Sequence, residues 1–385
     1  MSADWQTKPF EDCIEKVSYT TKIQRKDFLT EGAFPIISQE EAFINGFWDE
    51  EIDLFKVVRP LVVFGDHTKV LKYVDFDFVL GADGVKLLPP RDFLSPRFFF
   101  YFLQSVDLDS LGYARHYRLL KELDISYPPL TEQQRIVGIL DEAFDGIATA
   151  KANAEKNLQN ARALFESHLQ SVFDASGNSW ERVTLESLLE RGWIEGHLDG
   201  NHGGDYPRKE EFISEGVPYI SANCLDGESI DMSRAKYLSP SRAAKLRKGI
   251  AINEDVLFAH NATVGPVAIL YTDEAKVILG TSLTYYRCNQ HFILPTYLAH
   301  YMRSFAFKTQ YLQVMGQSTR NQVPITKQRE FFHVMPPMEE QRRIVETLNG
   351  LFEETQRLES LYQRKLTALD ELKKSLLHQA FSGAL

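Results

Sequence analysis

Two long stretches of the chain place apolar residues at alternating spacings of three and four, the pattern of an amphipathic helix. Each pattern continues for about five heptads, which is longer than the helices of ordinary domains. The two stretches therefore predict a pair of helices that form a coiled-coil seam. The alternative is that each helix packs only on its own domain. The seam residues predicted are Leu140, Phe144, Ile147, Ala150, Ala154, Leu158, Ala161, Phe165, Leu169 and Val172 in the first helix, and Leu348, Leu351, Thr355, Leu358, Tyr362, Leu366, Leu369, Leu372 and Leu376 in the second.

The same motif precedes both stretches. Residues 128–137 read PPLTEQQRIV and residues 336–345 read PPMEEQRRIV, an offset of 208 positions. An ungapped comparison of residues 128–173 with residues 336–381 gives 14 identities in 46 positions. A repeat of this length, at a period near half of the chain, indicates two copies of one structural unit.

Each copy of the motif predicts the start of a helix. The two prolines favour an extended entry and suppress helix in the residues before them. Thr131 is a good N-cap, and Glu132 lies where the helix dipole favours an anion. The second copy keeps the charge with Glu339 and Glu340 but has a weaker cap. Helices of roughly 36 residues would rise about 54 Å.

The remaining regions alternate short apolar runs with glycine-containing turns, as mixed α/β domains do. In the first region we predict strands at 34–38, 57–64, 70–80 and 84–88, and a helix after Pro96. The second region repeats this order: EGVPYIS at 215–221 corresponds to EGAFPIIS at 31–38, and GQSTRNQVPITK at 316–327 takes the place of GYARHYRLLK at 112–121. The predicted organisation is two α/β domains at 1–127 and 177–335, and two helical segments at 128–176 and 336–385.

Composition narrows the class of protein. A chain of 385 residues with 44% hydrophobic residues can bury two or three domain cores. Its apolar runs are too short for a membrane span and its N-terminus has no signal-peptide pattern, so the expected location is the cytoplasm. Three cysteines without a C-x-x-C pair support neither a disulfide framework nor a thiolate metal site. The net charge of −10 means that a nucleic-acid-binding function would need locally gathered basic residues or a partner that contacts the phosphates.

The sequence lacks the common catalytic motifs. Neither a phosphate-binding loop nor a dinucleotide-binding glycine motif is present, and the Pro-Pro pairs lack the flanking residues of the amino-methyltransferase loop. His197, Asp199 and His202 could be considered as metal ligands, but no fourth ligand is suitably spaced. A glycine-rich loop that contacts another molecule is the preferred interpretation. We therefore expect no cofactor and no catalysis by this chain alone.

Polar and basic residues in the loops of each domain are candidate DNA contacts, because such side chains hydrogen-bond base edges and phosphates. For each of them the alternative is an ordinary exposed loop side chain. The candidates in the first domain are His67, Thr68, Lys69, Tyr113, Arg115, His116, Tyr117 and Arg118. The candidates in the second domain are Asn201, His202, Tyr206, Arg208, Lys209, Asn261, Thr263, Ser318, Arg320 and Asn321.

The doubled Pro-Pro-x-x-Glu-Gln-x-Arg-Ile-Val motif, the DGNHGGDYPR loop at 199–208 and the order domain, helix, domain, helix resemble the DNA specificity subunit of Type I restriction-modification systems. The resemblance covers the whole chain. It implies that each domain is a target-recognition domain that reads one half of a split sequence in double-stranded DNA, and that the helices run antiparallel as a spacer. It also implies assembly with two modification subunits, which use S-adenosylmethionine to methylate adenine, and with restriction motor subunits. Two other hypotheses stay open: a coiled-coil assembly adaptor without DNA specificity, and an unrecognised enzyme.

Overall fold

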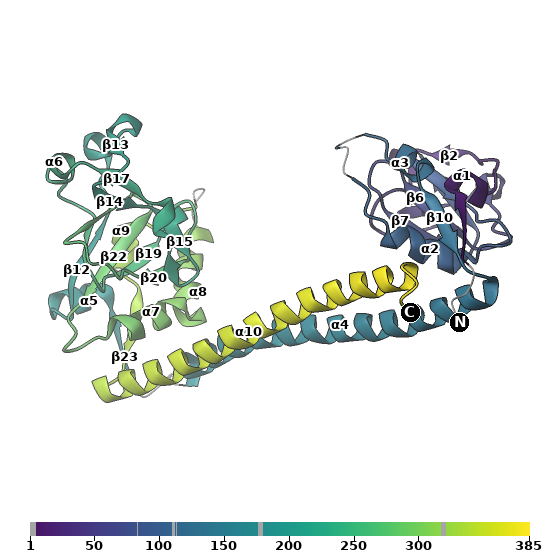
Figure 1. The fold of residues 1–385 in the computed structure, drawn as a ribbon. Helices are drawn as coiled ribbons and strands as arrows, with labels where there is room; N and C mark the ends of the chain where they lie inside the picture. Colours follow the sequence, from purple (N-terminus) through teal and green to yellow (C-terminus); the bar gives the residue numbers. More distant parts are fainter. Residues whose placement is uncertain (1–4, 83, 110–111, 113, 176–179, 317–320) are drawn as a thin grey trace. The chain divides into compact units, whose positions relative to one another are not determined.

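The computed structural model describes residues 5–82, 84–109, 112, 114–175, 180–316 and 321–385 (Figure 1). Contacts between residues divide the chain into two compact units. Unit 1 comprises Met1–Lys156 and Tyr362–Leu385, and unit 2 comprises Asn157–Leu361. Each unit contains one globular α/β region together with half of α4 (Leu130–Ala175) and half of α10 (Met338–Phe381). The predicted class, two mixed α/β regions and two long helices, is confirmed.

The globular region of unit 1 contains two sheets and a two-stranded ribbon. One sheet has the order β7-β6-β9, and the other is built around β8, which pairs in parallel with β2 and β3. The ribbon joins β1 to β10 at the point where the chain enters α4. The strands are β1 (Gln6–Pro9), β2 (Lys22–Ile23), β3 (Phe34–Ile37), β4 (Gly46–Trp48), β5 (Leu54–Phe55), β6 (Leu61–Gly65), β7 (Leu71–Val74), β8 (Phe78–Gly81), β9 (Val85–Leu88) and β10 (Asp124–Tyr127), and the short helices are α1 (Phe10–Cys13), α2 (Pro96–Ser105) and α3 (Tyr117–Lys121).

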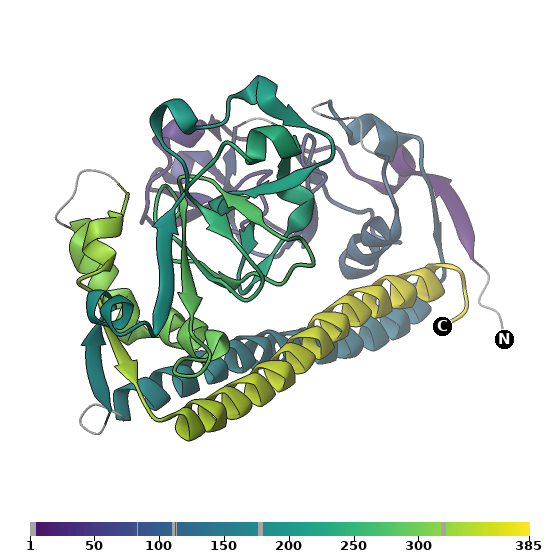
Figure 2. The ribbon, with the colours of Figure 1, turned by 90° about the vertical axis from the view of Figure 1, so that its left-hand side faces the viewer.

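The globular region of unit 2 repeats this plan with additions. A ribbon of β11 and β23 joins it to the long helices (Figure 2), and two sheets have the orders β12-β22-β19-β20 and β13-β17-β14-β21-β18. The strands are β11 (Glu181–Thr184), β12 (Ile194–Asp199), β13 (Phe212–Ile213), β14 (Val217–Ile220), β15 (Leu225–Asp226), β16 (Ser229–Ile230), β17 (Lys236–Leu238), β18 (Ile250–Ala251), β19 (Val256–Ala259), β20 (Val267–Ile269), β21 (Val277–Leu279), β22 (Leu283–Cys288) and β23 (Phe332–Met335). The helices are α5 (Leu185–Glu190), α6 (Pro240–Ala243), α7 (Pro295–Arg303), α8 (Phe305–Gly316) and α9 (Ile325–Gln328).

The predicted strands are present with shifted limits. The run at 57–64 becomes a strand only from Leu61, and the run at 70–80 is two strands, β7 and β8, that belong to different sheets. The helix expected after Pro96 is α2, which has Pro96 at its first position, where the missing N–H costs no hydrogen bond. None of the described helices has the long apolar run that crossing a bilayer requires.

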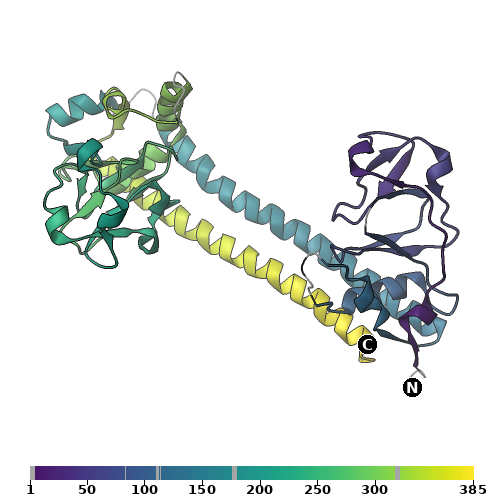
Figure 3. The same cartoon turned by 90° about the horizontal axis from the view of Figure 1, so that it is seen from above.

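Within unit 1 the two long helices run antiparallel, because the first half of α4 packs beside the last turns of α10 (Figure 3). Ile136 and Leu140 of α4 share one core with Leu377 and Ala380 of α10, and Lys151 forms an ion pair with Asp370. The core also includes α2 and β10. The end of α10 is therefore an integral part of the fold of unit 1.

Unit 2 contains the reciprocal arrangement. Phe165 and Leu169, from the second half of α4, share one core with Ile344 and Leu348 at the start of α10. Arg162, which precedes Phe165 in α4, forms an ion pair with Glu359, which follows Leu348 in α10, so the two helices are antiparallel here as well. In each unit, therefore, the helix that follows the globular region is covered by the end of the other helix, as the predicted antiparallel pair requires.

Three details of the helix predictions were wrong. The helices contain 46 and 44 residues, so the expectation of roughly 36 was too short. Thr131 is not the N-cap, because α4 already begins at Leu130 and the carbonyl oxygen of Pro129 accepts the N–H of Glu132. Leu372, expected in the seam, is 47% exposed.

The glutamine of the repeated motif fastens each long helix to its globular region. Gln133 is completely buried, and its Oε1 accepts the N–H of Ser95 at 2.8 Å. Its Nε2 donates to the carbonyl oxygens of Phe93 and Pro128 at 2.9 and 2.8 Å. The side chain thereby closes the first turn of α4 onto the segment that precedes α2.

Gln341 makes the same three bonds in unit 2. Its Oε1 accepts the N–H of Leu294 at 3.0 Å, and its Nε2 donates to the carbonyl oxygens of Phe292 and Pro336 at 2.8 and 3.0 Å. Buried amide groups need such partners because an unsatisfied polar atom in a core is costly. This requirement explains why both copies of the motif contain a glutamine at this position.

Candidate nucleic-acid interface

In unit 1, two segments that are distant in the sequence meet at the end of β6. The N–H of His116 donates to the carbonyl oxygen of Asp66 at 2.7 Å, and the N–H of Tyr117 donates to the carboxylate of Asp66, also at 2.7 Å. Asp66 is buried, so it fixes the start of α3 on the turn at 65–70. The structure therefore brings together the two groups of candidate residues predicted for this domain.

The same turn is held from a third segment. The hydroxyl of Thr68 donates to the carbonyl oxygen of Gln39 at 2.6 Å, and the N–H of His67 donates to Oε1 of Gln39 at 3.3 Å. Lys69 adopts a φ of 62°, a left-handed conformation that is uncommon for residues other than glycine and that concentrates at functional sites. Sequence reasoning missed Gln39 and Asp66, because neither belongs to a recognisable motif.

Unit 2 has an equivalent junction at the end of β19. The N–H of Val323 donates to the carbonyl oxygen of His260 at 2.8 Å, as His116 does to Asp66 in unit 1. Asn321 donates its side-chain amide to the carbonyl oxygen of Ala262 at 3.0 Å, and Ala262 has a φ of 65°. Both units thus carry a strained turn after the corresponding strand, bonded to the segment that leads to the last strand.

The loop after β12 reaches the same end of the sheet in unit 2, since Asp199 pairs with Thr284 and Ala259 with Leu283 across adjacent strands. His202 lies here and contacts the carboxylate of Asp199 with its Nε2 at 2.6 Å. Asn201 is buried and bonds both backbone groups of Lys248. Asn201 therefore shapes the loop, whereas His202 is exposed on it.

The predicted residues separate into three groups by exposure. Thr68, Arg115 and Arg118 of unit 1, and His202, Thr263 and Asn321 of unit 2, are exposed at the two junctions. His67, Lys69, Tyr117 and Asn261 are half-buried there, and His116 and Asn201 are buried. Tyr113, Ser318 and Arg320 lie outside the described residues.

Three candidates of unit 2 lie on a different support. Tyr206, Arg208 and Lys209 are exposed on the segment after His202. This segment is held to α6 by Arg242, whose guanidinium donates to the carbonyl oxygen of Asp205 at 3.0 Å. This segment therefore rests on α6 and not on the turn at 260–263.

The buried histidines of unit 2 stabilise the fold behind the junction. The Nε2–H of His197 donates to Oε1 of Gln328 at 3.1 Å, and burial lowers the pKa of His197 to about 4. Burial also lowers the pKa of His260, which lies at the junction itself. His197 thus faces Gln328, whereas His202 pairs with Asp199. In the described part of the chain, no three histidine, cysteine, aspartate or glutamate side chains are grouped as metal ligands.

Two exposed arginines, Arg115 and Arg118, supply positive charge at the junction of unit 1. Lys121 pairs with Glu11 at 2.7 Å, and Lys86 lies 3.9 Å from Asp66. The ammonium of Lys69 is directed inward and donates to the carbonyl oxygen of Leu108 at 3.0 Å. Exposed arginines beside a polar turn suit both phosphate and base contacts.

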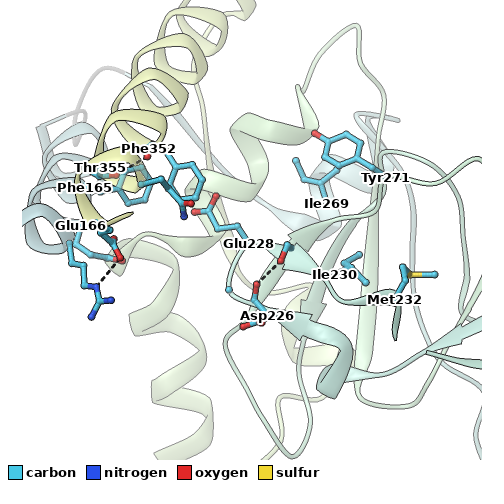
Figure 4. A pocket seen from close by; sticks show the side chains of 15 residues that line it. Phe165, Glu166, Asp226, Glu228, Ile230, Met232, Ile269, Tyr271, Phe352 and Thr355 are labelled. Atoms are coloured by element: carbon cyan, nitrogen blue, oxygen red, sulfur yellow. Dashed lines mark hydrogen bonds and ion pairs between the residues drawn. The ribbon is translucent and has the colours of Figure 1, made fainter. Parts of the chain in front are cut away.

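A cavity of about 890 Å³ lies in unit 2 between the long helices and the hairpin of β15 and β16 (Figure 4). Phe165 and Phe352 line it from the helices, and Ile269 and Tyr271 line it from the globular region. Unit 1 has a cavity of about 410 Å³ beside the end of α10. Its α10 residues are Asp370, Lys373, Lys374 and Leu377, the repeat counterparts of Arg162, Phe165, Glu166 and Leu169. The first three counterparts line the larger cavity, and Leu169 lines a second cavity of about 400 Å³ in unit 2.

Comparison with known proteins identifies relatives of the whole arrangement. The family described as "Type I restriction modification DNA specificity domain" matches residues 2–159 and again residues 179–367. The specificity subunit of the Type I restriction enzyme EcoBI from Escherichia coli is 20% identical over 78% of this chain and 68% of its own length. The putative type I restriction enzyme MjaX specificity subunit from Methanocaldococcus jannaschii is 22% identical over 99% of this chain and 94% of its own length.

Solved structures share the fold. A chain from a study of complex assembly and conformational transition of the type I R-M system aligns with a TM-score of 0.73 and 18% identity, over 99% of this chain and 98% of that chain. The HsdS subunit from Thermoanaerobacter tengcongensis aligns with a TM-score of 0.56 and 19% identity, over 99% of this chain and 97% of that chain. The two matched family segments each contain one globular region and the start of the long helix that follows it.

Proposed function

The chain belongs to the Type I restriction-modification DNA specificity family, and on this premise we propose that its two globular regions each read one half of a bipartite sequence in double-stranded DNA. The chain is a DNA-recognition component and not a catalyst, as the specificity subunits of this family are. The observation that carries the proposal is the pair of equivalent junctions, one in each unit, where strained turns present exposed polar and basic side chains. Two similar scaffolds with different residues at the same place can read two different half-sites.

At the junction of unit 1 we assign the contacts to Thr68, Arg115 and Arg118, because these three side chains are exposed. Arginine recognises guanine with two parallel hydrogen bonds, and it also pairs with phosphates. His116 and Asp66 are buried, so they position the contact residues. At the junction of unit 2, the corresponding contacts are assigned to His202, Asn261, Thr263 and Asn321.

The long helices offer surfaces for partner subunits. Leu164 of α4 and Leu372 of α10 are repeat counterparts, and they are 50% and 47% exposed. An exposed leucine recurs at the same repeat position in both units, and this recurrence is our reason to assign a protein interface there. We assign these surfaces, one in each unit, to two modification subunits, through which restriction motor subunits join. Such partners would also contribute phosphate contacts that an acidic chain with a net charge of −10 lacks.

The contact residues can be tested in the complex of this chain with its modification subunits. Arg115→Ala should weaken binding to a cognate duplex by about 5- to 150-fold, the equivalent of about 1–3 kcal/mol for a lost base contact. The loss should depend on the base pairs of one half-site only. Thr263→Ala should affect the other half-site.

Arg91→Ala provides a matched control for Arg115→Ala. Arg91 is exposed and follows the C-terminal end of β9. The junction lies at the other end of β9, where Val85 pairs with Gly65. Its loss removes one positive charge from the same unit without touching the junction. Equal losses of affinity for Arg91→Ala and Arg115→Ala, on cognate and on unrelated duplexes, would reject the assignment.

A further inference from the structure

The two interhelical ion pairs occupy equivalent positions in the two units but have opposite polarity. Lys151 of α4 pairs with Asp370 of α10 in unit 1, and Arg162 of α4 pairs with Glu359 of α10 in unit 2. The repeat offset of 208 relates Lys151 to Glu359 and Arg162 to Asp370. A base in one copy of the repeat therefore stands where the other copy has an acid.

Exposure shows that these positions are geometrically equivalent. The side chains of Lys151 and Glu359 are 31% and 32% exposed, and those of Asp370 and Arg162 are 58% and 63% exposed. In each ion pair, therefore, one side chain is about one-third exposed and the other about three-fifths exposed, and the less exposed side chains, Lys151 and Glu359, are repeat counterparts. At these positions the sign of the charge is reversed between the two copies.

The apolar residues near the C-terminal ends of the two helices are alike. Leu377 and Phe381 of α10 contribute to the core of unit 1, and their repeat counterparts in α4 are also a leucine and a phenylalanine, Leu169 and Phe173. Between the ion pairs the seam residues differ, since Ala154 and Ala161 of α4 correspond to Tyr362 and Leu369 of α10. Pairing of each helix with the same helix of another chain, here called self-pairing, would therefore change packing as well as charge, and the test below changes charge alone.

The charges make that self-pairing unfavourable. If a second α4 replaced α10, the place of Asp370 would be taken by Arg162 of the second copy, opposite Lys151. If a second α10 replaced α4, Glu359 would face Asp370 of the second copy. Both self-pairings bring together two like-charged pairs, whereas the pairing of α4 with α10 has two opposite-charged pairs.

We propose that the opposite polarity of the two ion pairs selects the pairing of α4 with α10 of the same chain over pairing of either helix with its own copy in a second chain. The surfaces involved are the interhelical contacts of Lys151 with Asp370 in unit 1 and of Arg162 with Glu359 in unit 2, and the excluded partner is a second copy of this chain. If the proposed function holds, self-pairing of α4 would join two copies of the first reading domain and produce a symmetric target. The selection itself does not depend on DNA binding.

The test uses the full chain, folded and then cleaved at a protease site introduced between Asp174 and Trp180. Cleavage leaves two fragments, one with each long helix, which can exchange partners. Native mass spectrometry then measures the proportion of mixed pairs and self-pairs at equilibrium. Circular dichroism and urea unfolding of each variant before cleavage verify that it is folded.

Two charge-reversed variants keep the ion pairs within one chain but remove the like-charge contacts of self-pairs. In Lys151→Glu with Asp370→Lys, a self-paired α4 has Glu opposite Arg162, and a self-paired α10 has Lys opposite Glu359. Arg162→Glu with Glu359→Arg has the same consequence. For each variant, the equilibrium constant for exchange into self-pairs should rise by about tenfold or more, because four repulsive contacts become attractive.

Two controls isolate the charge pattern from any effect on stability. The quadruple variant that combines both reversals restores like charges in every self-pair, so it should return to the wild-type proportion of mixed pairs. Lys151→Arg with Asp370→Glu keeps the original polarity and should also behave as wild type. Nearby Lys373, which interacts electrostatically with Lys151 and Asp370, is unchanged throughout. The proposal is overturned if either double reversal exchanges no more than wild type, or if the quadruple variant exchanges as much as the double reversals.

Discussion

The buried glutamine of the repeated motif gives the sharpest prediction about stability. Replacing Gln133 by leucine keeps a side chain of similar size but removes one acceptor and the amide donor. The N–H of Ser95 and the carbonyl oxygens of Phe93 and Pro128 would then lose their partner. Since Gln133 is 0% exposed, water cannot replace the lost bonds without opening the packing between α4 and the globular region.

The magnitude follows from these three bonds. A buried polar group left without a partner costs about 1–3 kcal/mol, and carbonyl oxygens with other contacts fall at the lower end of this range. The total for Gln133→Leu should be about 3–5 kcal/mol in the free energy of unfolding. Gln341→Leu should cost the same, because its bonds have the same lengths within 0.2 Å, from 2.8 to 3.0 Å against 2.8 to 2.9 Å.

Urea unfolding followed by circular dichroism measures this loss. With a slope of about 2 kcal/mol per molar urea, the transition of the affected unit should move down by about 1.5–2.5 M. The adjacent Gln134 is exposed on the same turn of α4, so Gln134→Leu is a matched control that should shift the transition by less than about 0.3 M. Equal midpoints for Gln133→Leu and Gln134→Leu would refute the structural role assigned to the motif.

Two further predictions concern acid stability and the junction of unit 1. Burial lowers the pKa of His300 and of His333 to about 4, below the unfolded value of about 6.5. The stability of unit 2 should therefore be complete above pH 6.5 and decline as the pH falls toward 4. At pH 5 each histidine should reduce the free energy of unfolding by about 2 kcal/mol. Urea unfolding midpoints measured between pH 7 and pH 5 test this prediction. His300→Gln should reduce the dependence of the midpoint on pH, and His291→Gln, at an exposed position, should leave it unchanged. A midpoint that does not depend on pH would contradict the prediction. Asp66→Ala should lower the affinity for DNA by about tenfold at one half-site, because the N–H of Tyr117 loses its acceptor. A binding assay on duplexes altered in either half measures this. An equal loss for both halves would mean that the carboxylate only supports the general fold.

The long helices could be predicted because their signal is repeated and local. Apolar residues at three-four spacing become buried or half-buried wherever two helices pair, and in α4 every predicted seam residue from Leu140 to Val172 does so. Leu372 departs from the pattern because Lys373, next to it, turns its ammonium over the ring of Phe144 at 5.0 Å. A lysine stem thus covers a seam position that the pattern assigned to a leucine.

The meaning of the motif could be predicted only in part. Its prolines and glutamate indicate a helix start, but the buried role of Gln133 depends on Phe93 and Ser95, about 40 residues earlier in the chain. In the same way, the junction of unit 1 joins residues near 66 to residues near 116. Composition identified both groups as polar and basic, yet only the fold shows that they meet.

Burial separates residues that the sequence could not distinguish. His116 and Arg115 are neighbours with similar chemistry, but His116 is buried against Asp66 and Arg115 is exposed. The difference arises because His116, the residue before α3, is held on the carbonyl oxygen of Asp66 by its N–H and its Nδ1, and Arg115 lies before this attachment. Hydrophobic patterning gives little guidance in so short an element, so candidate DNA contacts taken from the sequence necessarily include structural residues.

The central claim is that each globular region reads its own half of a bipartite target. Its most direct test replaces residues 180–335 by the corresponding region of another family member and maps the methylated adenines in the genome of cells that contain the chimera and its modification subunits. The account predicts that one half of the methylated sequence changes and the other half stays the same. A change in both halves, or in neither, would contradict it.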